Sequence, residues 1–500
     1  MSGKSEADYD FIVFGGEDRA EIRHVGHDIR RWLPLDLFPS LRDAEGDLAR
    51  WGRSPLRPLL DRAAQYIDAK VLEKIARDVD AATASLTKLG DLDAVVQGVN
   101  TQLTAMVGPQ HAVSTGLGLA PTEGTRLIRA LQLMIDGNRR GVAEASLGSA
   151  NVLYLALKHL EMQALADENA RRHTFLAIEE PEAHLHPHLQ RLVYRTYLRT
   201  KDVTEKVRKA YKARTILLTT HSANVASVAP LADVVVLKRK ATGTVGRSLR
   251  RAAKSLDKGD LDDIERYLDV TRGELFFARG VLLVEGDAER FLMPALAALH
   301  DPPLDFDELG ISVCSVAGTN FAPYIRLLGH AGLRIPYAVL TDFDPKEGPG
   351  SQEDLDPKEV GAKSGYGLKR VVNQIMAEVM PENIWERLSF QQVVDDAPEW
   401  GVFLNDHTFE IDLFKAGNHE LFSTAVQGVT TNNRMIERFA GWAADPDSLD
   451  KAAFLKDIDS VGKGRLAQRL ASLITEQGEM ELPEYIANAF DYLHSELDEL

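Results

Sequence analysis

The stretches VLLVEGDAE at Val281–Glu289 and AVLTDFDP at Ala338–Pro345 decide the fold of this chain. Each begins as a short apolar run, which predicts a buried strand, and each ends in carboxylates. Glu285 follows the first run directly, and Glu289 falls in the first turn of the helix expected after it. The pattern therefore predicts two strands of an α/β sheet with acidic side chains at their carboxyl ends.

The second run delivers Asp342 and Asp344, whose spacing of two residues puts both side chains on one side of an extended chain. Ligands gather at the carboxyl ends of strands in parallel α/β sheets. If the two strands are neighbours, these aspartates converge with Glu285 and Glu289. Such carboxylates repel one another unless a hard cation lies among them, and oxygen ligands suit Mg²⁺ or Mn²⁺. A single acidic residue after a strand is also an ordinary turn former or helix cap, so the expectation depends on the pairing of the two stretches.

The composition is that of a globular protein with several domains. The chain has 500 residues, of which 44% are hydrophobic and 27% charged, and this length predicts two to four domains. The single cysteine, Cys314, excludes an intramolecular disulfide and fits a reducing compartment. No apolar run approaches the roughly 18 residues that span a bilayer, and the opening MSGKSEADYD lacks the apolar core of a signal peptide. We therefore expect a cytoplasmic protein without membrane contact.

The net charge of −17 argues against a protein that coats nucleic acid by charge alone. A local basic segment can still contact DNA. KRKATGTVGRSLRRAAK at Lys238–Lys254 has seven Lys or Arg residues and no acid, so it is either a solvated linker or a contact to the DNA backbone. The candidate DNA-binding residues in it are Lys238, Arg239, Lys240, Arg247, Arg250 and Arg251.

The pair of acidic stretches resembles the Toprim domain of topoisomerases, primases and some nucleases. That domain carries VEGxxE first and then, after a further strand, an apolar strand that ends in DxD. In the family the first glutamate is a metal ligand or a general acid–base group, and the DxD pair holds metal. The resemblance assigns these roles to Glu285, Asp342 and Asp344. It also gives Ile311–Val316 the place of the intervening strand.

A second constellation lies upstream, in three segments. SLGS at Ser146–Ser149 opens a long apolar stretch. TFLAIEEPEAHLHPH at Thr174–His188 begins as a strand and ends in two glutamates and a histidine-rich loop, and TILLTTHS at Thr215–Ser222 is a further strand that ends in a histidine. A base next to a metal ligand is what hydrolysis requires, and a helix N-terminus favours a phosphate.

In this order the three segments resemble the C-terminal half of an ABC-type ATPase of the RecF/SMC kind. The resemblance makes Ser146 and Gly148 part of a degenerate signature motif, which contacts the γ-phosphate bound by a partner subunit. Glu179 takes the Walker B position that holds magnesium through water, and Glu180 takes the place of the general base. His221 is the switch histidine that senses the γ-phosphate.

The Walker A loop that such a site requires is not found, because the chain contains no GxxxxGK[ST]. The GKS at Gly3–Ser5 has no preceding strand or glycine and no apolar helix after it. We therefore expect an incomplete ATPase domain, either the tail of a longer protein or a split subunit. Its own ATPase activity should be weak or absent, and ATP should bind only if the missing Walker A part is supplied.

The apolar periodicity of residues 58–107 predicts helices without a chemical motif. We interpret them as a dimerisation insertion, so that a homodimer is expected. The predicted organisation is the C-terminal part of an ABC-type ATPase domain at 1–57 and 108–275, the helical insertion at 58–107, and a Toprim nuclease domain with C-terminal helical elements at 276–500.

The combination of both halves on one chain resembles the OLD (overcoming lysogenization defect) nucleases, in their class 2, over about residues 10–475. EEPEAHLHP, TTHS, VEGDAE, LTDFDP, TFEIDL and GKGRLAQRLA occur here in the family's order. The fold class is accordingly α/β, an incomplete ABC-type domain with a helical insertion followed by a parallel-sheet Toprim domain. The resemblance also implies phage defence or DNA repair as the biological role.

By this resemblance the chain is a DNA endonuclease or nickase that uses two divalent ions, Mg²⁺ or Mn²⁺, and is regulated by its ATPase module. The implied metal ligands are Glu285, Glu289, Asp342, Asp344 and Glu410. Lys463 would stabilise charge on the scissile phosphate. Asp287 is either a further ligand or the N-cap of its helix, and Asp412 is a further candidate ligand.

Two other classes of protein compete with this interpretation. A topoisomerase-like enzyme also uses Toprim, but it needs an activated tyrosine in a separate DNA-binding domain. A DNA-binding scaffold of the SMC or RecF type would not cleave, and it would leave the Toprim carboxylates unexplained.

Overall fold

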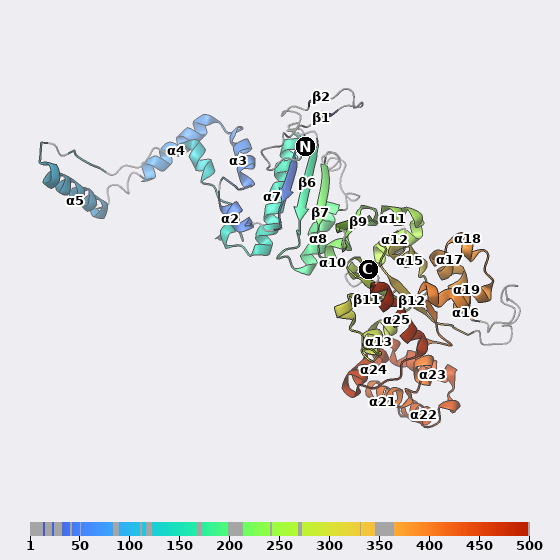
Figure 1. The fold of residues 1–500 in the computed structure, drawn as a ribbon. Coiled ribbons are helices and arrows are strands. Elements are labelled where there is room, and N and C mark those ends of the chain that lie inside the picture. The colour runs from blue at the N-terminus through green and yellow to red at the C-terminus, as the bar shows by residue number, and fades with distance from the viewer. Residues whose placement is uncertain are drawn as a thin grey trace. The chain divides into compact units, whose positions relative to one another are not determined.

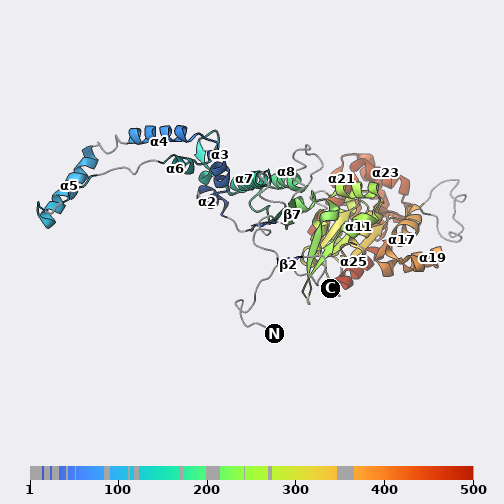
Figure 2. The same cartoon turned by 90° about the horizontal axis from the view of Figure 1, so that it is seen from above.

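The computed structural model describes residues 14–15, 23–24, 33–40, 43–50, 52–83, 90–110, 113–116, 123–167, 173–198, 214–240, 243–268, 273–330, 332–345 and 365–498. It divides into two compact units, Met1–Thr220 and His221–Leu500 (Figures 1 and 2). The predicted domain boundary at 275/276 lies inside the second unit. Among the described helices, none is long and apolar enough to cross a membrane.

The first unit contains a three-stranded parallel sheet (Figure 1). The strand order is β3 (Leu35–Phe38), β6 (Thr174–Glu179) and β7 (Arg214–Thr219). The described helices of this unit are α2 Ala44–Ala49, α3 Leu56–Ala64, α4 Ala69–Thr83, α5 Gly90–Val107, α6 Gly124–Arg129, α7 Leu147–Asp167 and α8 Pro187–Leu198. The remaining described elements are two short antiparallel strand pairs and a 3-10 turn. The pairs are β1–β2 (Phe14–Gly15 with Arg23–His24) and β4–β5 (Met134–Ile135 with Arg140–Gly141), and the turn is at Val142–Glu144.

One face of this sheet exposes apolar side chains. The register pairs Leu35 with Phe175, and Ala177 lies between Leu37 and Leu217 on neighbouring strands. Leu35, Leu37, Phe175 and Leu217 are all exposed. On the opposite face Leu176 and Ile178 are buried, so the strands alternate between a covered and an uncovered side.

Residues 58–107, predicted to be helical, form most of α3 and all of α4 and α5. Their side chains are largely exposed, and in α4 the described buried residue is Ala76. A helix with so little burial gains little stability from packing within its own chain. The role of this segment in dimerisation stays a prediction.

The second unit is built on a four-stranded parallel sheet of order β11-β10-β12-β13. The strands are β10 (Gly280–Val284), β11 (Ile311–Ser315), β12 (Tyr337–Thr341) and β13 (Val402–Leu404). The register pairs Leu282 of β10 with Ala338 of β12, which confirms that the two acidic stretches follow neighbouring strands. An antiparallel hairpin of β8 (Val235–Lys240) and β9 (Gly243–Ser248) precedes this sheet.

Helices cover both faces of the four-stranded sheet, because the strands are apolar on both sides. The described helices are α10 Ala223–Ala226, α11 Arg250–Ser255, α12 Lys258–Tyr267, α13 Asp287–Ala297, α14 Phe306–Leu309, α15 Ala322–Leu328, α16 Tyr366–Arg370, α17 Met376–Val379, α18 Glu382–Trp385, α19 Phe390–Asp396, α20 Phe409–Lys415, α21 His419–Val429, α22 Asn433–Ala444, α23 Lys451–Val461, α24 Lys463–Gln477 and α25 Glu484–Asp498. Short 3-10 turns lie at Leu231–Asp233, Gly273–Phe276, Ala397–Trp400 and Pro446–Ser448, and a π-helical turn lies at Val371–Ile375.

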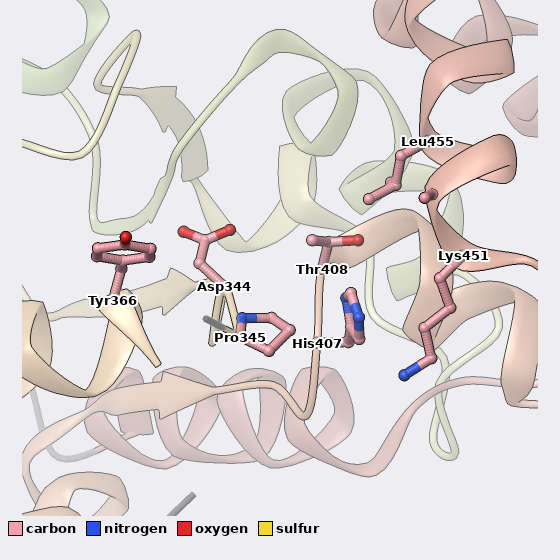
Figure 3. A pocket seen from close by; sticks show the side chains of 8 residues that line it. Asp344, Pro345, Tyr366, His407, Thr408, Lys451 and Leu455 are labelled. Carbon is pink, nitrogen blue, oxygen red and sulfur yellow. The ribbon is translucent and has the colours of Figure 1, made fainter. Parts of the chain in front are cut away.

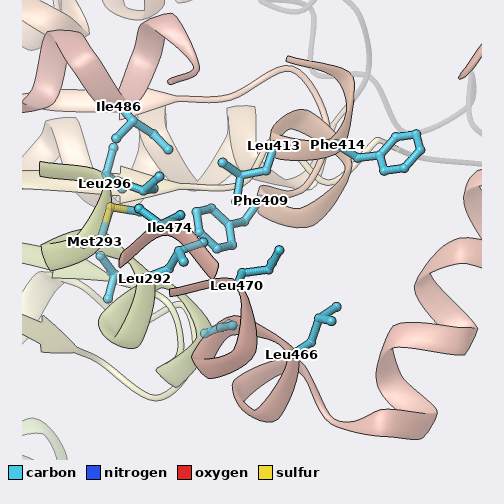
Figure 4. Close-up of a cluster of buried hydrophobic side chains, with 14 of the residues drawn as sticks. Leu292, Met293, Leu296, Phe409, Leu413, Phe414, Leu466, Leu470, Ile474 and Ile486 are labelled. Carbon is cyan, nitrogen blue, oxygen red and sulfur yellow. The ribbon is translucent and has the colours of Figure 1, made fainter. Parts of the chain in front are cut away.

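Alternate residues of each strand enter two different hydrophobic cores. Leu282 and Leu340 pack against α13, α20, α24 and α25, a core whose side chains are shown in Figure 4. Leu283 and Val339 face the other side, where α11, α15 and α19 lie. The helices that carry candidate site residues (α13, α20 and α24) therefore share one core with the strands that end in Glu285 and Asp342.

Helix α16 approaches the end of β12 very closely, and Gly367 makes this possible. A Cβ atom at Gly367 would lie 1.9 Å from the backbone oxygen of Asp342. The Gly367 N–H donates to the Phe343 carbonyl at 2.9 Å. This contact fixes the first turn of α16 against the strand end and so determines where Arg370, one turn further on, can reach.

Gly367→Ala should therefore destabilise the protein by about 1–3 kcal/mol, because the added methyl group has to displace backbone. Gly441→Ala is the matched control, since Gly441 lies inside helix α22 and a Cβ there meets open space. That substitution should stabilise the protein by roughly 0.5–1 kcal/mol. Urea unfolding followed by circular dichroism measures both, and a Gly367→Ala variant as stable as the control would contradict the close approach.

Candidate active site

The structure brings the predicted carboxylates together at the carboxyl ends of β10 and β12. Glu285 follows β10, Glu289 lies in the first turn of α13, and Asp342 follows β12. Glu410 enters from the first turn of α20, and it acts electrostatically on both Glu289 and Asp342. Asp344 joins them from the loop after β12. The structure thus collects five acidic residues from three chain segments into one cluster, which we call the carboxylate cluster.

One oxygen of Glu285 is held by three hydrogen bonds. Its Oε1 accepts from the Thr341 hydroxyl at 2.6 Å, from the Asp342 N–H at 2.9 Å, and from the guanidinium of Arg370. Carboxylates that accept several hydrogen bonds with charge-assisted donors are strongly oriented. Oε1 is therefore fully used within the protein, and Oε2 is the oxygen of this side chain that can meet a ligand.

Arg370 is the residue that ties the cluster together. Its Nη1 donates to Glu285 and, at 2.6 Å, to the Thr341 hydroxyl, and its Nη2 donates to Asp344 Oδ2 at 2.7 Å. The side chain is only 9% exposed. Arg370 was not predicted from the sequence, where an isolated Lys-Arg pair gives no signal that it reaches a strand end. Its position directly before the π-helical turn at Val371–Ile375 fits the frequent placement of such turns at functional sites.

Asp342 is fixed by an amide that sequence reasoning also missed. Asn405, at the end of β13, donates from Nδ2 to Asp342 Oδ1 at 2.6 Å and accepts from the Phe343 N–H at 2.7 Å. Asp344 adopts the left-handed conformation, with φ of 47°, and its N–H donates to the His407 carbonyl at 3.0 Å. Backbone and side-chain contacts therefore set both members of the DxD pair.

Burial and the neighbouring charges raise the pKa of two carboxyl groups of the cluster. Burial raises the pKa of Glu289 from 4.5 to about 7, and the charges of Glu410 and Glu285 add to this effect. Burial, together with the charges of Glu285 and Glu289, also raises the pKa of Asp342 well above its ordinary value. Like charges in a low-dielectric site favour protonation in this way. The site consequently has an excess of negative charge that a further cation would relieve.

Lys463 supplies the second cation of the site. It begins helix α24, and its Nζ lies 3.2 Å from Glu410 Oε1. Burial favours the neutral amine, but the charge and hydrogen bond of Glu410 outweigh it and raise the pKa of Lys463. Lys463 is therefore positively charged at neutral pH and lies beside the carboxylate cluster.

The two further candidate metal ligands, Asp287 and Asp412, are less central to the carboxylate cluster. Gly286 is the N-cap of α13, so Asp287 is not the cap but an exposed residue of the first turn. Asp412 Oδ2 accepts the N–H groups of Asp406 and His407 at 3.1 and 2.8 Å, and burial raises the pKa of Asp412 to about 6. Asp412 thus closes the loop before α20, and its role as a metal ligand stays a prediction.

The chemistry of the donor set fits a hard divalent cation. Every candidate ligand is a carboxylate, which is what Mg²⁺ and Mn²⁺ prefer. Burial, with the neighbouring negative charges, disfavours the ionised forms of Glu289 and Asp342 in the absence of a further cation. In the described part of the chain, no three His, Cys, Asp or Glu side chains are already arranged around one point as ligands. In this arrangement Arg370 and Lys463 occupy oxygens of Glu285, Asp344 and Glu410 instead.

The candidate ATPase residues lie mostly in the first unit. Glu179 ends β6, where its Oε2 accepts the Ser40 N–H at 3.3 Å, and Glu180 follows with φ of 40°. Ser146 caps α7 and accepts the Ser149 N–H at 3.3 Å.

The start of α7 packs tightly on the loop after Glu180. A Cβ at Gly148 would lie 2.6 Å from the His184 oxygen, and Asn151 donates to the Ala183 carbonyl at 2.9 Å. The third segment joins the second as well, because β7 pairs with β6 and the Thr220 hydroxyl donates to Glu182 Oε1 at 2.7 Å. His221, from the third, is an exposed residue at the start of the second unit.

The basic segment forms two antiparallel paired strands followed by a helix. Lys238 and Arg239 lie on β8, Arg247 on β9, and Arg250 and Arg251 begin α11. Lys240 ends β8. The contact of these residues with DNA stays a prediction.

Two protein families match parts of this chain. The family described as overcoming lysogenization defect protein-like, TOPRIM domain, matches residues 276–344, and the AAA ATPase domain matches residues 60–226. The first match begins at the predicted Toprim boundary and covers the strands that lead to Glu285 and Asp342.

Curated relatives carry nuclease names. Endonuclease GajA of Bacillus cereus (strain HuB5-5) is 22% identical over 295 residues, which are 51% of this chain and 41% of GajA. The OLD nuclease of Thermus scotoductus (strain ATCC 700910 / SA-01) is 30% identical over 173 residues, which are 33% of this chain and 30% of that protein. The chain thus spans less than half the length of the curated relatives it matches.

Solved structures of OLD proteins are also similar in sequence. The C-terminal region of the Burkholderia pseudomallei OLD protein is 37% identical and matches 44% of this chain and 99% of its own, with a TM-score of 0.37. The C-terminal region of the Xanthomonas campestris pv. campestris OLD protein is 34% identical and matches 45% of this chain and 97% of its own, with a TM-score of 0.36. The two family matches confirm the predicted resemblance and fold class: the chain carries an OLD-like Toprim domain after a segment that matches the AAA ATPase domain.

Proposed function

We propose that this protein is a divalent-metal-dependent DNA nuclease that hydrolyses phosphodiester bonds at the carboxylate cluster. The observation that carries the proposal is the convergence of five carboxylates at the ends of two neighbouring strands, where the described part of the chain places two cations, Arg370 and Lys463, against them. A phosphodiester is itself an anion, so such a site cannot accept one without further positive charge. Relatives named as nucleases support the same activity.

The residues that would hold two ions, Mg²⁺ or Mn²⁺, are Glu285, Glu289, Asp342, Asp344 and Glu410. When bound, such ions lower the pKa of a water molecule and neutralise charge on the phosphate. The protein contributes the geometry. Glu285 presents Oε2 because Oε1 is held, and Asn405 orients Asp342.

Lys463 has a role of its own in this proposal. It is charged and adjoins Glu410, so it stabilises the charge that develops on the phosphate during cleavage. Its partner Glu410 is also a candidate ligand, so the ion pair holds the amine at the edge of the cluster. There the amine can still contact a phosphate. No deprotonation of Lys463 is required.

The ATPase segments, which lie in the first unit except for His221, would regulate cleavage. We assign ATP control to Ser146, Gly148, Glu179, Glu180 and His221, with ATP binding dependent on a Walker A loop supplied to this site. The match of residues 60–226 to the AAA ATPase domain supports this role. A homodimer through residues 58–107 and DNA contacts from the basic hairpin belong to the same proposal.

Asp342→Asn tests the proposed activity. Supercoiled plasmid is incubated with the protein and Mg²⁺, Mn²⁺, Ca²⁺ or EDTA, and nicked and linear products are separated on a gel. We expect cleavage with Mg²⁺ or Mn²⁺ and none in EDTA. Asp342→Asn should abolish it because a ligand loses its charge, whereas Asp406→Asn, the same change at an exposed residue outside the cluster, should not. DNA binding without cleavage under every metal would favour the scaffold of the SMC or RecF type.

Arg370→Gln should cost about 3–5 kcal/mol of stability in EDTA, because it leaves Glu285 and Asp344 without their buried partner. Excess Mn²⁺ should restore more stability to this variant than to the wild type, since the ion replaces the lost charge. Urea unfolding with and without Mn²⁺ measures both effects.

The control for Arg370 is Arg438→Gln. Arg438 forms a two-pronged pair with Asp457, with its Nε 2.9 Å from Asp457 Oδ2, away from the cluster. The stability that Arg438→Gln loses should be the same with and without Mn²⁺. If Arg370→Gln behaves like Arg438→Gln, Arg370 is only a structural residue.

Glu289→Gln should change the pH dependence of stability. The folded protein holds the Glu289 proton up to a pKa of about 7, above the ordinary 4.5, so the metal-free protein loses stability as the pH rises through this interval. Glutamine mimics the protonated form. In EDTA the variant should therefore have the same melting temperature as the wild type near pH 5 and a higher melting temperature than the wild type at pH 8. Glu437→Gln, on the exposed side of α22, should show no such pH-dependent difference, and a parallel shift at both pH values would contradict the raised pKa.

A further inference from the structure

A cavity of about 490 Å³ opens beside the carboxylate cluster. Its walls include Asp344, Tyr366, His407, Lys451 and Leu455 (Figure 3). The volume lies within the range of about 300–1,000 Å³ that is typical of small-molecule sites. The cavity is not part of the cluster itself, because apart from Asp344 it is lined by none of the candidate metal ligands.

Asp344 joins the cavity to the cluster. Its carboxylate accepts from Arg370 at 2.7 Å on the cluster side, and the same residue lines the cavity. A DNA strand whose phosphate lies at the cluster can continue past Asp344 into the cavity, since Asp344 borders both. The cavity is therefore placed to receive the part of the strand next to that phosphate.

Tyr366 gives the cavity an aromatic wall. It is the first residue of α16 and is 61% exposed. Its N–H donates to the Asp344 carbonyl at 2.9 Å, so the position of the residue is tied to the cluster. An exposed aromatic ring held by the backbone provides a stacking surface for a nucleobase.

Lys451 lies across the cavity from Tyr366 (Figure 3). It is the first residue of α23. Between the two lie Asp344, His407 and Thr408 (Figure 3). One wall can thus stack a base while the opposite wall offers a positive charge to a phosphate, which is the combination that single-stranded DNA requires.

We propose that this cavity binds one unstacked nucleotide adjoining the phosphate to be cleaved, with its base on Tyr366 and its outer phosphate at Lys451. The inference depends on the proposed function and gives it a substrate class. A base can reach Tyr366 only after it leaves the helical stack, so the substrate is single-stranded or locally opened DNA. Intact duplex is excluded from the cavity.

The test measures binding of the full chain to a single-stranded oligonucleotide in Ca²⁺, which allows binding to be separated from cleavage. One base is replaced by 2-aminopurine, whose fluorescence reports stacking, and its position is varied along the strand. Tyr366→Ala should weaken binding about 5- to 150-fold and remove the stacking signal at one position. Tyr366→Phe keeps the aromatic ring, so it should keep both the binding affinity and the stacking signal of the wild type.

Lys451→Ala provides a second, independent arm. It should lower the slope of log affinity against log salt by about one, as the loss of one phosphate contact does. Lys456→Ala, an exposed lysine on the same helix, should leave the slope unchanged. Thermal unfolding of each variant shows that it is folded.

Three outcomes would overturn the proposal. The first is that Tyr366→Ala binds the single strand as tightly as the wild type does. The second is that binding of blunt duplex weakens equally in Tyr366→Ala. The third is that binding of a free deoxynucleoside monophosphate weakens in Tyr366→Ala although the monophosphate does not compete with the oligonucleotide. Absence of cleavage in Mg²⁺ and Mn²⁺ together with Tyr366-dependent binding would instead disprove the nuclease while leaving the nucleotide site intact.

Discussion

The contact of Arg370 with Glu285 is the interaction on which the rest of the site depends. Carboxylates from three segments cannot be collected in a partly buried site without compensation, because removing an unpaired charge from water costs several kcal/mol. Arg370 spans two of them and the Thr341 hydroxyl at once. The fold provides this contact through the adjacency of β10 and β12 and through Gly367, which lets α16 lie against the strand end.

The sequence predicted the acidic half of this site and missed the half that balances it. Glu285 and Asp342 are readable because each follows an apolar strand, and local patterns determine strand ends. Arg370 and Asn405 belong to segments whose own patterns carry no chemistry. Their roles arise from tertiary contacts, 85 residues apart for Arg370 with Glu285 and 63 for Asn405 with Asp342, which a single sequence does not encode locally.

The fold was predictable to a similar degree. Apolar runs predicted β6, β7, β10 and β12, and the family resemblance assigned β11 to the strand between the two acidic stretches of the chain. The strand β3 and the order of the strands within each sheet were not predicted. The basic segment at Lys238–Lys254 was ambiguous because its charges suit both a solvated linker and a contact to the DNA backbone, and it forms paired strands and a helix. The helices at 58–107 were predicted from periodicity, but periodicity does not reveal what covers a helix, and here most of their surface is exposed.

Two acidic residues that follow strands, Glu180 and Asp344, have positive φ values of 40° and 47°. Residues other than glycine, asparagine and aspartate tolerate this backbone poorly, at a cost of roughly 1–2 kcal/mol. Alanine scanning would therefore misjudge Asp344, since alanine removes the charge and also strains the turn that positions its neighbours. Asparagine separates the two effects. Over evolution the same constraint narrows the exchanges open to this position, so a family member that lost catalysis would more readily drift to asparagine or glycine here than to a hydrophobic residue.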